Sequence, residues 1–199
     1  MNDSNLVLQI LTKVCNKLIL NYEQLNELDR LIGDGDHGTN IKRGSEEILK
    51  TLPNWEGKTT KEILNNSAMI LMSKVGGSSG PILATMLMQM AKENNLADAL
   101  VKAGEGIQAR GKAKVGEKTL VDILVPFAQT YQEKVLANID HKTAMELALK
   151  VAKEYLDNSK NIPATKGRAS YLGNRSIGIT DAGSQTMYYI LETIYEETK

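Results

Sequence analysis

The spacing of apolar residues constrains this fold most, because it repeats with the period of a helix and nowhere alternates convincingly with the period of a strand. The first helix, capped by Asp3 or Ser4, would bury one face formed by Val7, Ile10, Leu11, Val14 and Leu18. Further helices are expected near 25–32, 39–52, 59–72, 81–91, 97–109, 119–138 (kinked at Pro126) and 142–158, and after Asp181. Residues 166–180 are the least helical and are predicted to form a long functional loop. The pattern predicts one all-α domain, residues 1–199, of about eight or nine helices in a closed bundle.

The amino-acid composition excludes several classes of protein. With 199 residues, 42% of them hydrophobic, the chain can bury one core, which excludes wholesale disorder. The 24 basic and 24 acidic side chains balance, which argues against nucleic acid as a main partner. No apolar run approaches the roughly 20 residues that span a bilayer, and the N-terminus lacks the basic start of a secretory signal. The single cysteine, Cys15, allows no intrachain disulfide, so we expect a cytoplasmic protein with Cys15 as a small buried hydrophobe.

The glycines are grouped rather than scattered. Most of the 16 fall within 33–38, 76–80, 104–116 and 167–183. Single glycines after helices would suffice for short turns, whereas grouped glycines at helix starts let backbone N–H groups approach an anion. The helix dipole adds about half a positive charge at the same place. The grouping therefore favours a phosphate-binding protein, although tight turns alone would explain about half of these glycines.

The most informative segment is GDGDHGTN at 33–40, together with Asp29 just before it. Asp29, Asp34 and Asp36 lie within eight residues, and so many unpaired carboxylates would repel unless a cation held them. Hard oxygen ligands suit Mg²⁺ or Ca²⁺, but the spacing lacks the glycine and the glutamate of an EF-hand loop. With Thr39 and Asn40 opening a helix, we interpret the segment as a Mg²⁺–phosphate site; the alternative is a polar turn with a helix cap.

Three further segments carry weaker signals. KVGGSSGP at 74–81 would offer Ser78, Ser79 and free amides at a helix start. GKAKVGEKT at 111–119 nearly spells a P-loop, but Glu117 interrupts it and no strand precedes it, so a P-loop is rejected and Lys118 is expected on the surface. In TKGRASYLG at 165–173, an arginine would hold phosphate, and the later Asp181 would cap the last helix or contact a ligand.

Taken in order, these segments resemble one known family. GDGDHGTN at 33–40, KVGGSSGP at 74–81, RGKAKVGEKT at 110–119, KGRASYLG at 166–173 and DAG at 181–183 cover most of the chain. Together they are similar to the ADP-binding L subunits of phosphotransferase-system-dependent dihydroxyacetone kinases. The resemblance implies an antiparallel eight-helix barrel with a nucleotide at one rim.

The resemblance also implies the site residues. The carboxylates of Asp29, Asp34 and Asp36 match those that coordinate two Mg²⁺ ions on the nucleotide phosphates. The residues that match the nucleotide contacts are His37, Gly38, Thr39, Asn40, Ser78, Ser79, Gly116, Val125, Arg168, Asp181, Ala182 and Gly183. Beyond nucleotide contact, the role of His37 stays open between catalysis and hydrogen bonding to the carboxylates.

In this family ADP acts as a resident coenzyme. A phosphohistidine carrier of the phosphotransferase system (the M subunit) rephosphorylates it, and the phosphoryl group passes to dihydroxyacetone on a separate K subunit. The resemblance therefore implies a transferase subunit whose general base and substrate histidine reside on a partner, and a monomer or homodimer that assembles with K.

Three alternatives remain open. A nucleotide domain of a fatty-acid kinase shares the barrel, but that group tends to read GDGDTG where this chain has His37. A nucleotide-sensing regulatory subunit would keep the same phosphate-site residues. A helical Ca²⁺ module would bind its ion without nucleotide.

Overall fold

The computed structural model describes residues 3–199, and within this range the chain is built from helices with no strand. In chain order the elements are α1 (Ser4–Leu20), α2 (Tyr22–Ile32), α3 (His37–Thr51), the 3₁₀-helix η1 (Leu52–Trp55), α4 (Thr60–Lys74), α5 (Ser79–Met90), α6 (Leu96–Gly111), α7 (Val121–Leu136), α8 (His141–Asn158), the 3₁₀-helices η2 (Ser159–Asn161) and η3 (Arg168–Ser176), and α9 (Ala182–Thr198).

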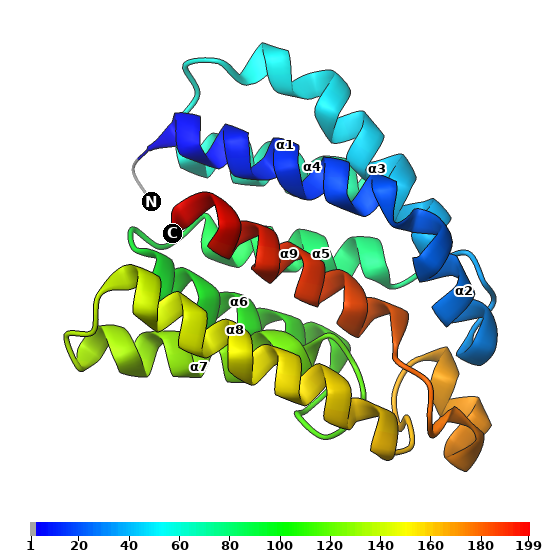
Figure 1. The fold of residues 1–199 in the computed structure, drawn as a ribbon. Helices are drawn as coiled ribbons and strands as arrows, with labels where there is room; N and C mark the ends of the chain where they lie inside the picture. The colour runs from blue at the N-terminus through cyan, green and yellow to red at the C-terminus, as the bar shows by residue number, and fades with distance from the viewer. Residues whose placement is uncertain (1–2) are drawn as a thin grey trace.

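Eight of the α-helices form a closed ring. From α3 to α9 each helix packs against the next α-helix in the chain, and α9 packs back against α1, which in turn contacts α3. Sequence neighbours run in opposite directions, and α2 lies across one end of the ring against α3, α9 and η3 (Figure 1). This arrangement confirms the predicted all-α, antiparallel eight-helix barrel.

The ring closes around an apolar interior to which every helix except α2 contributes. Among its least exposed side chains are Ile63, Leu100, Phe127, Met145, Met187 and Leu191. Cys15 belongs to this interior, and burial raises the pKa of its thiol to about 12, so it is an inert hydrophobe, as predicted. The interior also holds an apolar cavity of about 570 Å³ lined mainly by α1, α3, α4, α5 and α9. None of the described helices has the length and hydropathy needed to cross a bilayer.

Most predicted helix ends are confirmed by their caps. The side chain of Asp3 accepts hydrogen bonds from two amides at the start of α1, and Thr59 and Glu62 form a complete capping box on α4. Asp140 and Asp181 cap α8 and α9. Helix α7 continues through Pro126.

Two expectations about local structure need correction. Helix α3 begins at His37, two residues before the predicted start, because a carboxylate from α2 supplies the missing acceptors for its first amides. Much of the segment predicted as loop winds into η3, which is interrupted at Gly173, whose φ of 51° is left-handed.

Candidate functional site

The alternating directions of the ring helices bring the N-termini of α3, α5, α7 and α9 to the same end of the molecule (Figure 1). A cavity of about 590 Å³ opens there, lined by the first residues of all four helices, including His37, Ser79, Val121 and Ala182. Each N-terminus carries the positive end of a helix dipole. The fold therefore concentrates four anion-attracting helix ends around one cavity.

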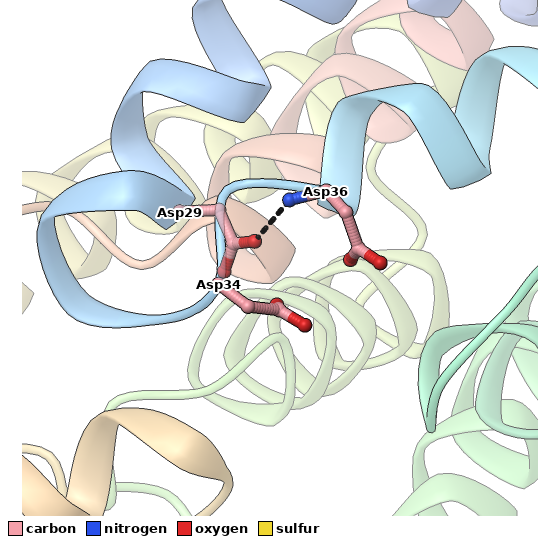
Figure 2. Close-up of side chains that lie close together, drawn as sticks. All are labelled: Asp29, Asp34 and Asp36. Atoms are coloured by element: carbon pink, nitrogen blue, oxygen red, sulfur yellow. Dashed lines mark hydrogen bonds between the residues drawn. The ribbon is translucent and has the colours of Figure 1, made fainter.

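The acidic residues of the 29–36 region lie on the wall of this cavity. Asp29 extends from the last turn of α2, and Asp34 and Asp36 extend from the loop between α2 and α3 (Figure 2). One carboxylate oxygen from each residue lies within 4.8 Å of the others. Asp29 is partly buried, whereas the other two are exposed.

Asp29 has a second function in the fold. Its Oδ2 accepts a hydrogen bond from the backbone amide of Asp36 at 2.9 Å (Figure 2) and another from the backbone amide of His37 at 3.2 Å. The side chain of Asp36 makes no capping hydrogen bond of its own. Asp29 thus stabilises the start of α3 and holds the loop in the conformation that brings the three carboxylates together.

This trio suits a hard divalent cation. Three carboxylate oxygens with no thiolate are the donor set that Mg²⁺ prefers, and it usually binds with a phosphate and water completing its coordination. Within the described residues, the one cationic side chain that pairs with the trio is Arg168 from η3, which forms an ion pair with Asp34. One arginine offsets only part of the charge of three carboxylates, so the cluster fits a bound cation.

His37 joins three helices behind the carboxylates. Its Nε2 lies 2.8 Å from Oγ1 of Thr186 on α9, and its Nδ1 lies 3.2 Å from Oγ of Ser79 on α5. The Thr186 hydroxyl donates to the carbonyl of Ala182, so the ring nitrogen Nε2 is the donor in the first contact. Burial lowers the pKa of His37, partly opposed by the charges of Asp29 and Asp36.

Asp181 lies at the start of α9 and acts as its cap. Its Oδ2 accepts hydrogen bonds from the amide of Ser184, at 2.7 Å, and from the Ser184 hydroxyl, at 3.0 Å. Burial raises the pKa of the Asp181 carboxyl to about 6, and the nearby charges of Asp122 and Asp29 add to the increase. The predicted cap is therefore confirmed, and the same residue lines the cavity.

A buried carboxylate organises the loop between α6 and α7. Asp122 accepts hydrogen bonds from the amide of Gly116 at 2.6 Å and from the amide of Thr119 at 2.7 Å. Lys118 lies within this loop, and the prediction of a surface lysine is wrong, because its side chain is only 1% exposed. Sequence alone does not reveal this burial, since the groups that receive the ammonium come from residues more than 40 positions away.

The structure places most of the predicted site residues on the cavity. These are Asp29, Asp34, Asp36, His37, Asn40, Ser78, Ser79, Arg168, Asp181, Ala182 and Gly183. They come from four separate parts of the chain (29–40, 78–79, 168 and 181–183), which the closed ring brings to one rim.

Four predicted residues do not line the cavity. Gly38 packs against α2, where a Cβ would lie 1.9 Å from the carbonyl oxygen of Tyr22. Thr39 exchanges two hydrogen bonds with Asn26. Gly116 donates its amide to Asp122, and Val125 is buried on α7 against α6.

Sequence reasoning missed part of the lining. Beyond the residues predicted for the site, the cavity is lined by the apolar Ile32, Pro81, Ile82, Ile107, Ala113, Leu120 and Val121 and by the polar Arg110, Thr119 and Lys166. Several lie inside the quoted motifs, but apolar residues in helical spacing carry no signal that separates a cavity wall from a core.

Comparison with known proteins gives consistent matches. The DAK2 domain model matches residues 31–196. The chain is 43% identical to the PTS-dependent dihydroxyacetone kinase, ADP-binding subunit DhaL, of Lactococcus lactis, over 94% of this chain and 93% of that protein. It is 33% identical to the PEP-dependent dihydroxyacetone kinase, ADP-binding subunit DhaL, of Escherichia coli, over 86% of each chain.

A solved structure shows the same fold. The chain matches the dihydroxyacetone kinase from C. freundii in complex with AMP-PNP and Mg²⁺ with a TM-score of 0.76 and 22% identity. The match covers 98% of this chain and 34% of that one, so this chain spans about a third of the length of that kinase.

Proposed function

The chain belongs to the DAK2 domain family, and from that premise we propose that it is the ADP-binding subunit of a phosphoenolpyruvate-dependent dihydroxyacetone kinase. The observation that carries the proposal is the position of three convergent carboxylates on a cavity surrounded by four helix N-termini. The carboxylates would repel an anion that the helix N-termini would attract. A cation bound to the carboxylates and a polyphosphate bound to the helix ends satisfies both.

We assign the carboxylates of Asp29, Asp34 and Asp36 as the groups that would hold two Mg²⁺ ions beside the nucleotide phosphates. Bound there, Mg²⁺ neutralises phosphate charge and favours the loose transition state of phosphoryl transfer. In this proposal the hydroxyl of Ser78 and the amide of Ser79 bind phosphate oxygens at the start of α5, while the Ser79 hydroxyl donates to Nδ1 of His37.

The apolar part of the cavity suits the base of the nucleotide. Ile82, Ile107 and Leu120 line it, and each lies near the end of a ring helix. A purine offers a flat apolar face, which such side chains can cover. The cavity volume of about 590 Å³ is within the range of small-molecule sites.

In this proposal the chain binds and orients the nucleotide, and partners supply the rest of the reaction. ADP stays bound as a coenzyme, a phosphohistidine carrier (the M subunit) rephosphorylates it, and the γ-phosphoryl group passes to dihydroxyacetone on a K subunit. The nitrogens of His37 already bond to Ser79 and Thr186, so we assign this residue to holding α3, α5 and α9 together beside the nucleotide.

The test begins with freshly purified protein. Denaturation should release ADP in about equal amount to the chain, detected by the ratio of absorbance at 260 and 280 nm and by mass spectrometry. Adding the K subunit, dihydroxyacetone and phosphorylated carrier should then yield dihydroxyacetone phosphate without free ATP. An empty protein that turns over free ATP would indicate an ordinary kinase, and Ca²⁺ binding without nucleotide would indicate a calcium module.

A further inference from the structure

Lys118 is an unusual residue of this rim. Among the described residues it is the one lysine or arginine with a buried side chain. Its backbone has a φ of 61°, in the left-handed region that a glycine would adopt with less strain. Both this backbone conformation and burial disfavour a lysine at position 118. Its presence therefore indicates that the side chain makes a specific structural contact.

The side chain connects two distant points of the chain. Its Nζ donates hydrogen bonds to the carbonyl of Ser176 at 2.6 Å and to the carbonyl of Ile162 at 3.1 Å. Burial lowers the pKa of Lys118, whereas the nearby Asp181 carboxylate opposes this effect and favours the charged form. The ammonium thus lies between both ends of the stretch from 162 to 176, hereafter the 162–176 segment.

Other contacts close the same segment at its base. The amide of Ala164 donates to Oγ of Ser176 at 2.8 Å, and the amide of Thr165 donates to the carbonyl of Glu117 at 3.4 Å. The segment is therefore a loop whose two ends are held together and attached to Glu117 and Lys118. Its helical part is a 3₁₀-helix interrupted at Gly173, which holds its shape less firmly than an α-helix.

The residues that follow Thr165 line the same cavity as the acidic trio. Lys166, Gly167 and Arg168 line the cavity, and Arg168 forms its ion pair with Asp34. The guanidinium is exposed and reaches the site from outside the ring. The position of Arg168 therefore depends on the contacts that hold the two ends of the 162–176 segment.

We propose that Lys118 is a positioning residue for the nucleotide site: its ammonium fixes both ends of the 162–176 segment so that Arg168 is held opposite Asp34 and the phosphates. The inference rests on the proposed function, because it assigns to Lys118 an effect on Mg²⁺–ADP binding. If Lys118 only filled space, an uncharged side chain of similar length would give the same Mg²⁺–ADP affinity.

A double-mutant cycle tests this inference. Mg²⁺–ADP affinity is measured by calorimetry, after removal of bound nucleotide, for the parent, K118M, R168Q and the double variant. Lys118→Met keeps the unbranched stem and removes the ammonium, and we expect it to weaken Mg²⁺–ADP binding by roughly 10–100-fold. In the R168Q background the same change should weaken binding by less than about twofold, since the group that Lys118 positions is already absent.

Lys160 offers a matched control, because it is an exposed lysine just before the same segment. K160M should bind as the parent does. Should K118M fail to give the helical circular dichroism of the parent, Lys118→Gln, which keeps a donor on a shorter stem, replaces it in the cycle with the same criteria.

The outcomes separate the two proposals. A parent protein that binds no Mg²⁺–ADP refutes the proposed function itself. A parent that binds, with a K118M variant of unchanged affinity, refutes the inference about Lys118 alone. An equal loss of affinity in the parent and R168Q backgrounds also overturns it, because Lys118 would then support the cavity without acting through Arg168.

Discussion

Removing the charge of Asp36 should stabilise the protein without ligand while abolishing its response to Mg²⁺–ADP. The three carboxylates offer oxygens within 4.8 Å of one another, and two charges at that separation repel by about 0.9 kcal/mol in water. Asp36 has two such neighbours, one of them already paired with Arg168. Asp36→Asn costs no capping hydrogen bond, so we expect a gain of about 1–2 kcal/mol at low salt.

The assay is thermal unfolding in EDTA at low ionic strength, followed by circular dichroism, and repeated with Mg²⁺ and ADP. For a chain of this size the gain corresponds to an increase of about 2–8 °C in Tm without ligand. The parent should gain further stability with Mg²⁺–ADP, and D36N should not. Asp29→Ala provides the contrast, because it also loses the two amide hydrogen bonds at the start of α3 and should unfold earlier in EDTA. A D36N protein that is no more stable in EDTA, or still stabilised by Mg²⁺–ADP, would refute the reasoning.

Three further predictions test other parts of the structure. Burial raises the pKa of Asp181 from 3.8 to about 6, so the folded protein keeps a proton that the unfolded chain releases, and its stability falls as pH rises between those values. Asp181→Asn keeps a capping side chain. As pH rises from about 4 to 7, its free energy of unfolding in urea should increase relative to that of the parent by up to about 3 kcal/mol. A difference between the two proteins that stays constant over this pH range would contradict the prediction. Gly38→Ala should destabilise the fold by at least about 2 kcal/mol, because its Cβ would meet the Tyr22 carbonyl oxygen at 1.9 Å; unchanged unfolding would contradict the packing of α2 on α3. Thr59→Ala removes the capping box of α4 away from the cavity and should cost about 1 kcal/mol in urea unfolding with no change in ADP affinity.

Local signals predicted the helices well because their ends are determined by nearby residues. Asp3, Thr59, Asp140 and Asp181 each cap the helix that immediately follows. The start of α3 was misplaced for the opposite reason, since its amides are satisfied by Asp29 across a turn. When the acceptor lies outside the capping positions, the residues next to the helix start contain no pattern that predicts it.

The candidate site was predicted as a set of motifs, and its geometry was not. Gly38 and Gly116 were expected to approach a nucleotide, yet one makes room for a carbonyl of α2 and the other donates to Asp122. Lys118 looked like an ordinary surface lysine, and its acceptors are carbonyls on a distant segment. In each case the partner lies outside the quoted motif, so the motif by itself could not reveal it.

The amino-acid sequence by itself determined the helical class, most helix boundaries and the acidic loop, because helical periodicity, caps and clustered charges are properties of neighbouring residues. The tertiary structure alone decided that these parts form one site. Closing an up-and-down ring of helices places every second N-terminus at the same rim, so α3, α5, α7 and α9 bring the positive ends of their dipoles to the three carboxylates. That convergence depends on which helices pack side by side, and side-by-side packing is a long-range property of the folded chain.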